Sequence, residues 1–339
     1  MRPLLLLFLV ASAAFADALF TWQPTTKSPR FILSRTSPLM LSKSVDRYLK
    51  RLPKESLWTI FEREVKEQGS SAWLTKTELR LPEGKTDLLP VKAKKVRIAL
   101  VANDVDDMMP AGERISHLVE QFELAGADVY VIPLGADLVY PLEADREKFR
   151  EKVSKTFDAL VAIGGDDIAP SLSQAPAGLS THFHEVRDQA ELKWLRRYLK
   201  TGCGPLFGIC RGQQLTAVAL GHALIGDLPT QKKTEAHANN EHEISIGTST
   251  KNILYDILKK TEAEVYCAHH QAVIPRANSP LKVNAVAESG DKEVVESMQT
   301  DDRKVFLVQF HPELMDDETG KKILQGMVAH AKKRSCHRR

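Results

Sequence analysis

The stretch Pro205-Leu206-Phe207-Gly208-Ile209-Cys210-Arg211-Gly212-Gln213-Gln214 decides the fold. Its apolar first half predicts a buried strand, and the second half predicts a helix that begins after a sharp turn at Cys210. Glycines at positions 208 and 212 let the strand and the helix approach closely, because a Cβ at either position would stand between them. A side chain on such a turn projects outward, and the helix N-terminus favours negative charge on it. The pattern therefore indicates a nucleophilic cysteine more strongly than a buried structural one.

Strands and helices alternate on both sides of this stretch. The predicted strands before it are 96–102, 128–133 and 159–164, and the predicted helices around it are 112–125, 185–199 and 211–220. Further strands are expected at 243–246, 264–266, 283–288 and 305–310, with a closing helix at 320–333. Strands that are apolar on both faces and joined by helices favour a mostly parallel sheet covered on both sides. Functional residues of such sheets gather at the carboxyl ends of the strands.

A base for the cysteine follows the last predicted strand, in Val305-Phe306-Leu307-Val308-Gln309-Phe310-His311-Pro312-Glu313. If the segment is extended, His311 and Glu313 point to the same side. The carboxylate can then fix the imidazole tautomer while the other ring nitrogen faces the thiol. A His-x-Glu motif alone is weak, but together with the cysteine turn it predicts a Cys210-His311-Glu313 triad.

A second glycine turn, Gly164-Gly165-Asp166-Asp167-Ile168-Ala169-Pro170, follows the third predicted strand. Its glycines allow a backbone N–H to approach a reacting carbonyl. We expect the N–H groups of Gly165 and Arg211 to form an oxyanion hole. A plain turn is the alternative if the segment is taken by itself.

These three motifs, in this order, resemble the class I glutamine amidotransferase superfamily, and within it the γ-glutamyl-γ-aminobutyrate hydrolase-like branch of peptidase C26. Three further stretches favour that branch: Arg187-Asp188 with Glu191, His242-Glu243-Ile244, and Cys267-Ala268-His269-His270-Gln271-Ala272-Val273. The resemblance implies a flavodoxin-like α/β fold and hydrolysis of γ-glutamyl amides through a thioester. It also implies substrate contacts at Gln214, His270 and Gln271. Cys267 stands where the branch usually has Ser and Phe310 where Trp is common, which puts substrate choice in question more than catalysis.

The composition of the 339 residues is that of a globular protein, with 43% hydrophobic and 27% charged residues. It excludes disordered, collagen-like and multi-spanning membrane chains. The net charge is +3, and five basic residues fall within the last eight. The basic character of the chain therefore comes from this tail, which we expect to be solvated. The charge gives no reason to expect nucleic-acid binding.

The N-terminus has the pattern of a secretory signal. Arg2 precedes an apolar run from Leu4, and Ala14-Phe15-Ala16 offers a cleavage site. A buried N-terminal strand is the alternative. The run is too short for a spanning helix, which needs about 20 residues.

The expected domain organisation has four parts. They are a signal peptide at 1–16, a small helical extension and linker at 17–94, a catalytic domain at 95–331 and a basic tail at 332–339. Helical spacing within the extension predicts helices over Ser44–Leu52 and Glu55–Glu67, the second with Gly69 as a stop signal.

Four cysteines, at positions 203, 210, 267 and 336, permit a disulfide bond, but their spacing leaves the pairing open. His182 and His184 alternate as ligands on a strand do, whereas His237 and His242 miss the i, i+4 spacing of a helical metal site. We therefore expect no metal centre and no organic cofactor.

The sequence thus predicts a secreted or periplasmic cysteine hydrolase of γ-glutamyl amides. Its substrate would be a small γ-glutamyl amide or peptide, with polymers and a homodimer left open. No stable membrane anchor is expected after cleavage of the signal. Two alternatives remain: a glutaminase subunit of an amidotransferase, and a γ-glutamyl ligand-binding protein with a vestigial site.

Overall fold

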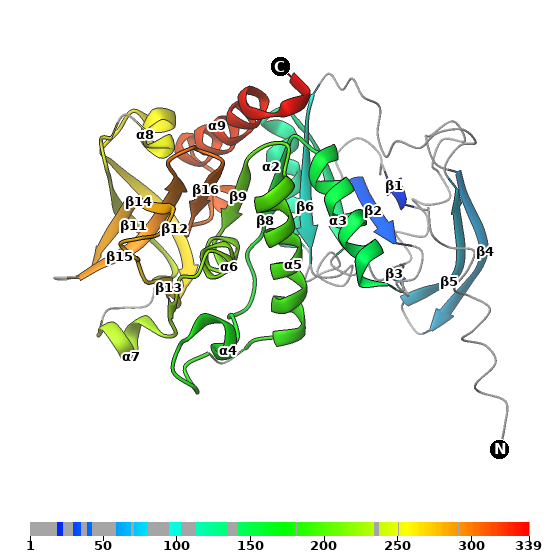
Figure 1. Ribbon diagram of the computed structural model, residues 1–339, viewed down its shortest axis with the longest axis horizontal. Helices are drawn as coiled ribbons and strands as arrows, with labels where there is room; N and C mark the ends of the chain where they lie inside the picture. The colour runs from blue at the N-terminus through cyan, green and yellow to red at the C-terminus, as the bar shows by residue number, and fades with distance from the viewer. Residues whose placement is uncertain are drawn as a thin grey trace.

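The computed structural model places one long mixed β-sheet at the centre of the molecule (Figure 1). The structure describes five N-terminal strands by their backbone alone, at 19–22, 30–34, 39–42, 59–68 and 71–80. It then describes residues 95–102, 113–133, 142–180, 182–233, 237–249, 251–289 and 292–338.

The centre of the sheet is parallel. Its strands lie in the order β7 (Ala127–Pro133), β6 (Val96–Ala102), β8 (Ala159–Ala162), β9 (Leu206–Ile209) and β16 (Val305–Val308). Every residue of β8, β9 and β16 is buried, as expected for strands covered on both faces. The mostly parallel sheet predicted from the alternation, and the flavodoxin-like fold that the resemblance implies, are therefore confirmed.

Helices cover both faces of this parallel part (Figure 1). On one face α3 (Glu143–Thr156) packs on α5 (Glu185–Thr201), which packs on α6 (Arg211–Ala219). On the other face α2 (Glu113–Leu124) packs against α9 (Glu318–Arg334). Among the described residues, no helix has the length and apolarity that crossing a membrane requires.

Beyond β16 the sheet continues as an antiparallel arm. Its strands are β15 (Lys292–Thr300), β14 (Leu281–Ser289), β11 (His237–Ile246) and β12 (Glu262–His269). Shorter elements surround the arm and the strand ends: β10 (Leu224–Ile225) paired with β13 (Ala272–Val273), α4 (Pro170–Ser173), α7 (Leu228–Lys232), α8 (Ile253–Leu258) and the 3-10 turns η3 (Pro312–Leu314) and η4 (Cys336–Arg338).

The N-terminal extension contains strands where a helix was expected. Thr59–Gln68 forms β4, which pairs antiparallel with β5 (Ser71–Arg80), so the predicted helix over Glu55–Glu67 is wrong from Thr59 onward. Gly69, interpreted as a helix stop, stands between the two paired strands. A few apolar residues at helical spacing do not exclude a strand when β-branched residues are among them. The predicted signal peptide and the helix over Ser44–Leu52 lie outside the described residues.

The remaining N-terminal strands join two different sheets. β1 (Leu19–Trp22) and β2 (Arg30–Ser34) extend the central sheet, with β2 parallel to β7. β3 (Leu39–Ser42) pairs with β5 and completes a separate three-stranded sheet.

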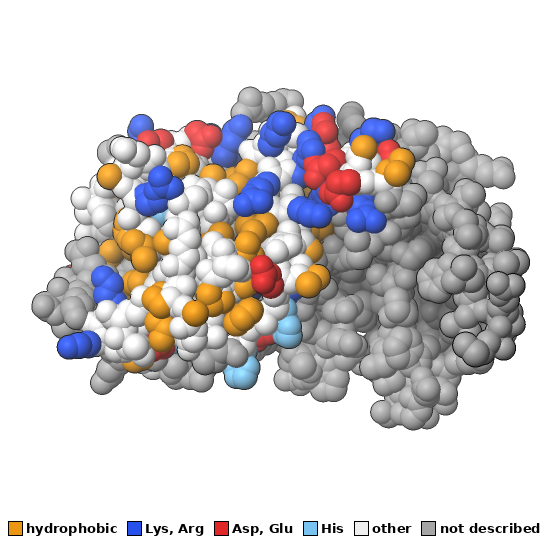
Figure 2. Space-filling model, turned by 60° about the horizontal axis from the view of Figure 1, so that its bottom comes forward, with side chains coloured by type: hydrophobic (Ala, Val, Ile, Leu, Met, Phe, Trp, Pro, Cys, Tyr) orange, Lys and Arg blue, Asp and Glu red, His pale blue; other side chains and the backbone are white. Residues whose placement is uncertain are grey.

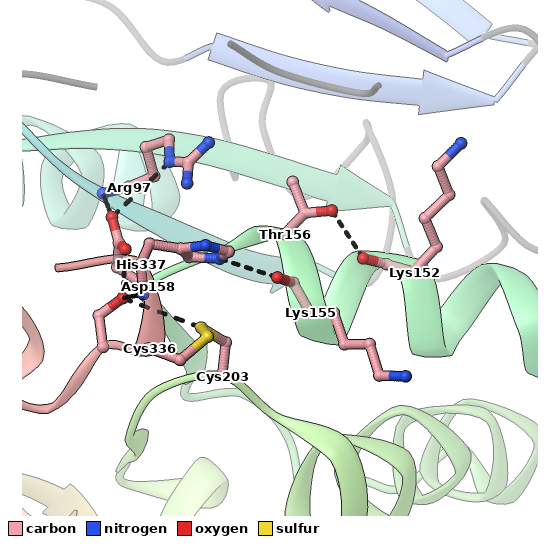
Figure 3. The surroundings of a disulfide bond; sticks show 9 residues. Arg97, Lys152, Lys155, Thr156, Asp158, Cys203, Cys336 and His337 are labelled. Carbon is pink, nitrogen blue, oxygen red and sulfur yellow. Dashed lines mark hydrogen bonds and ion pairs between the residues drawn. A yellow bond between two sulfur atoms is a disulfide. The ribbon is translucent and has the colours of Figure 1, made fainter. Parts of the chain in front are cut away.

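The C-terminal tail is held against the domain, although Lys332 and Lys333 in it are exposed to solvent as predicted. Helix α9 runs through Arg334, and the next residue, Ser335, is fully buried and donates to the Asp158 carboxylate at 2.5 Å. Cys336 then forms a disulfide bond with Cys203, with 5.3 Å between their Cα atoms (Figure 3). The Nε2 atom of His337 adds a hydrogen bond of 2.8 Å to the Lys155 carbonyl. The tail therefore closes the catalytic domain onto the end of α3 and the loop before β9.

The surface in Figure 2 carries acidic and basic side chains next to one another on the part that the structure describes. Ion pairs between α3 and α5 show the same mixing, since Arg197 contacts both Glu147 and Glu151.

Candidate active site

Cys210 lies on the turn between β9 and α6, as its flanking residues predict. Its backbone has φ 53° and ψ −113°, a conformation that residues other than glycine rarely adopt. An added Cβ at Gly208 would lie 2.7 Å from the Gly212 backbone, and one at Gly212 would clash with the Ala162 carbonyl oxygen. Both glycines are therefore required by the close approach of strand and helix, and the strained turn aims the Cys210 side chain past the strand end.

His311 and Glu313 stand beside Cys210 because β16 is parallel to β9 and ends at the same edge. His311 Nδ1 is 2.8 Å from Glu313 Oε1, which leaves the other ring nitrogen free to face Cys210. The imidazole and Cys210 are close together, since a Cβ added to Gly164 would contact both. The residues after His311 are not extended as predicted, since Pro312–Leu314 is a 3-10 turn. The turn brings the Glu313 carboxylate back to the imidazole, so the pairing holds although the predicted backbone was wrong.

A backbone hydrogen bond holds His311 in place, and neighbouring groups favour the charged form of its imidazole. The His311 N–H donates to the Tyr266 carbonyl on β12 at 2.9 Å. Burial acts to lower the pKa of His311, but the sulfur of Cys210 and the Glu313 carboxylate outweigh it and hold that pKa well above its usual range. The arrangement is that of a nucleophile, a base and an orienting carboxylate.

The predicted oxyanion donors lie on the two loops that flank Cys210. Arg211 is the first residue of α6, where backbone N–H groups have no partner within the helix. Gly164 lies against the site, since a Cβ added to it would be 3.2 Å from His311 Cε1 and 3.7 Å from Cys210 Cβ. Gly165 follows with φ 155°, and an added Cβ there would lie 2.7 Å from Arg187 Nη2, so only glycine fits.

A buried charge network joins these two loops. The Arg211 guanidinium, 1% exposed, pairs with Asp188 and Glu191 of α5. Burial acts to lower the pKa of Arg211, but the two carboxylates outweigh it and raise that pKa. Asp188 also accepts from the Ala169 N–H at 2.9 Å, and Arg187 Nε donates to Glu191 at 3.0 Å. Helix α5 therefore sets the distance between the Cys210 turn and the 164–169 loop.

The three predicted substrate-binding residues differ in their exposure and in the contacts that their side chains already make. Gln271 is 2% exposed, and its side chain accepts from the Ile168 N–H at 3.0 Å and donates to Ser180 Oγ at 2.8 Å. Gln214 is 3% exposed and donates to the Gln271 carbonyl at 3.0 Å. Both glutamines therefore help to hold the site together, Gln271 through its amide oxygen and nitrogen and Gln214 through its amide nitrogen.

His270 is the predicted contact that reaches the surface. Its side chain is 30% exposed and lies between two carboxylates, with Nε2 2.7 Å from Asp167 Oδ1 and Nδ1 3.0 Å from Asp227 Oδ1. The hydrogen bond to Asp167 leads in raising the pKa of His270 to about 9. His270 therefore ties the 164–169 loop to α7.

The structure also assembles a group that sequence spacing did not predict. His237, Cys267, His269 and Glu296 offer ligand-type atoms that all lie within 4.8 Å of one another, and all four residues are buried. They come from β11, β12 and β15, which are far apart in the sequence. One signal was available: Cys267 and His269 are two residues apart, as on one face of a strand.

The fold and this site together define a class I glutamine amidotransferase-like protein. The peptidase C26 family model matches residues 125–313, so the chain belongs to the Peptidase C26 family.

Two curated proteins and one solved structure resemble the chain. Protein NtpR of Enterococcus hirae is 36% identical over 191 residues, which cover 53% of this chain and 76% of NtpR. Anthranilate synthase component 2 of Saccharolobus solfataricus is 29% identical over 124 residues, covering 37% of this chain and 58% of that protein. The glutaminase domain of Trypanosoma brucei CTPS, solved with bound acivicin, superposes with a TM-score of 0.51 at 16% identity, covering 71% of this chain and 95% of that one. The last likeness concerns the fold alone.

Proposed function

We propose that the protein is an exported cysteine hydrolase that cleaves γ-glutamyl amide bonds through a Cys210-His311-Glu313 triad and a thioester. The observation that carries the proposal is the strained Cys210 turn, which stands beside an imidazole that Glu313 holds at 2.8 Å. Membership of the C26 family supports a hydrolase of this kind.

The proposed reaction begins when His311 takes the proton of the Cys210 thiol, which gives a thiolate and an imidazolium. The sulfur attacks the γ-carbonyl carbon, and the N–H groups of Gly165 and Arg211 stabilise the oxyanion. His311 then donates its proton to the leaving amine as the C–N bond breaks, which leaves a thioester on Cys210. Next, His311 takes a proton from water, the hydroxide attacks the thioester, and glutamate leaves as the sulfur recovers the electron pair.

Glu313 would orient the imidazole throughout and stabilise its charged form. The charge network of Arg211, Asp188 and Glu191 would hold both oxyanion donors in place, because it links the two loops that carry them. No step requires a metal or an organic cofactor.

Export is supported by the disulfide bond as well as by the N-terminal pattern. Disulfides persist in oxidising compartments and are rare in the cytosol. The Cys203–Cys336 bond joins residues 133 positions apart, and it fixes a segment next to the buried Asp158 (Figure 3). We therefore place the protein outside the cytoplasm, as a monomer or homodimer that acts on small γ-glutamyl amides or peptides.

The test is a substrate panel of γ-glutamyl amines, γ-glutamyl peptides, poly-γ-glutamate and free glutamine. We expect release of glutamate from one or more γ-glutamyl amides, and loss of that activity in Cys210→Ala with an unchanged circular dichroism spectrum. Turnover of glutamine alone would instead favour the glutaminase subunit. No turnover of any member, together with no labelling of Cys210 by acivicin, would favour a ligand-binding protein and overturn the proposal.

A further inference from the structure

The strongest feature outside the proposed triad is the buried group His237, Cys267, His269 and Glu296. Register explains how it forms: His237 on β11 pairs directly with His269 on β12, and Cys267 lies on the same face of β12 as His269. Glu296 on β15 is fully buried and faces this group. The four residues therefore meet although they span 60 positions of sequence.

The separations from Glu296 to the other three residues are close to those between metal ligands. Tetrahedral zinc, with bonds of about 2.0–2.3 Å, holds its nitrogen, oxygen and sulfur ligands about 3.2–3.8 Å from one another. Glu296 Oε1 lies 3.0 Å from His237 Nδ1 and 3.3 Å from His269 Nε2. Glu296 Oε2 lies 3.6 Å from Cys267 Sγ. Small shifts of side chains would therefore bring all four around one ion.

His269 has the orientation of a metal ligand. Its Nδ1 hydrogen-bonds the Gln271 carbonyl at 2.9 Å, a carbonyl that can only accept, so Nδ1 carries the proton and Nε2 has the free lone pair. Nε2 is buried and lies 3.3 Å from Glu296 Oε1 without forming a hydrogen bond of good geometry. Metal-binding histidines are usually held in this way, with the other ring nitrogen donating to a carbonyl or carboxylate.

We propose that His237, Cys267, His269 and Glu296 bind one Zn²⁺ ion in a structural site. A thiolate and a carboxylate would balance the charge of the ion, and four protein ligands would leave no open position for chemistry. His242 would support the site from outside, since its Nε2 lies 3.6 Å from Glu296 Oε1.

The site would also bear on the position of His311. β12 carries both Cys267 and His269, and its Tyr266 carbonyl accepts the His311 N–H at 2.9 Å. An ion that joined β11, β12 and β15 would therefore fix the strand that holds the imidazole. The proposal is independent of the proposed hydrolase activity, because it is tested by metal binding alone.

The experiment uses the full mature chain in a Cys210→Ala background. Cys203 and Cys336 form a disulfide, so Cys267 is then the one free thiol. We expect one equivalent of Zn²⁺ or Co²⁺ to bind, and the Co²⁺ form to show a thiolate-to-cobalt charge-transfer absorption. Cys267→Ser should abolish that absorption. His269→Ala should weaken Zn²⁺ binding about a hundredfold or more, since even loss of an outer partner costs 10- to 100-fold.

His182→Ala is the matched control, because this exposed histidine lies outside the group and its loss should leave binding unchanged. X-ray absorption at the zinc edge is measured on the unmutated chain, so it does not depend on whether a variant folds. It should show one sulfur and three nitrogen or oxygen ligands. The proposal is overturned if the unmutated chain binds no stoichiometric metal. It is equally overturned if the zinc edge shows no sulfur ligand, or if Cys267→Ser keeps full affinity and the cobalt absorption.

Discussion

Removing the Cys203–Cys336 disulfide bond in a Cys203→Ser/Cys336→Ser double variant should destabilise the protein strongly. A disulfide limits the freedom of the unfolded chain, and the effect grows with the logarithm of the loop that it closes. A separation of 133 residues gives about 5 kcal/mol as the chain-entropy limit. Native disulfides usually contribute less than that limit, so we expect a loss of about 2–5 kcal/mol.

Urea unfolding followed by circular dichroism measures this loss. With a urea m-value of about 3 kcal/mol per M, the midpoint should fall by about 1 M. The unmutated protein in the presence of a thiol reductant should show the same fall, whereas the double variant should not respond to reductant. If reduction leaves the midpoint of the unmutated protein where it was, the disulfide does not stabilise the fold and its support for export is lost.

Two further predictions concern the residues around the nucleophile. Glu313→Gln removes a carboxylate that helps to hold the pKa of His311 high, so the imidazolium should lose its proton at lower pH. The alkaline limb of the kcat/KM profile should therefore move to lower pH. We also expect kcat to fall about 10²- to 10⁴-fold. An unchanged profile would show that Glu313 does not orient His311. Gly212→Ala would drive a methyl group into the Ala162 carbonyl and should cost about 3 kcal/mol or more of stability in a thermal melt. Gly247→Ala, where the nearest atom outside its chain neighbours lies 3.5 Å from the added carbon, is the control, and an equal loss in both variants would contradict the packing explanation.

The parallel half of the sheet could be predicted because its strands are apolar along their whole length. β6 was predicted at its observed bounds, and β9 and β16 within two residues of theirs. The proposed triad followed from this, since parallel strands that pair directly carry Cys210 and His311 to one edge. Local motifs were sufficient to predict these residues, because each motif lies within a single turn at the end of a strand.

The antiparallel arm was harder to predict because its buried positions are polar. β15 was missed altogether: Glu296, Ser297 and Gln299 are buried in it, so it lacks the apolar alternation of a strand. Glu296 is hydrogen-bonded to His237 on β11, Ser297 to Leu307 on β16 and Gln299 to Asn284 on β14, as buried polar groups must be. Such partners come from other strands and leave no local pattern.

The proposed zinc ligands escaped prediction for the same reason. His237 was compared in sequence with the ligand spacing of a helix. It lies instead on a strand, where its neighbours are set by pairing with the next strand. His269 was assigned to the substrate-binding segment, and its partner Glu296 stands on a strand that was not predicted. Pairwise register, which the sequence of one chain does not display, assembles the group.

The most direct test of the central claim is to trap the acyl-enzyme. The protein is mixed with a γ-glutamyl substrate, quenched in acid during turnover, digested, and analysed by mass spectrometry. We predict a glutamyl thioester on the peptide that contains Cys210 in the unmutated protein, and none in Cys210→Ala. Turnover without any adduct on Cys210, or an adduct on Cys267 instead, would contradict the proposed mechanism.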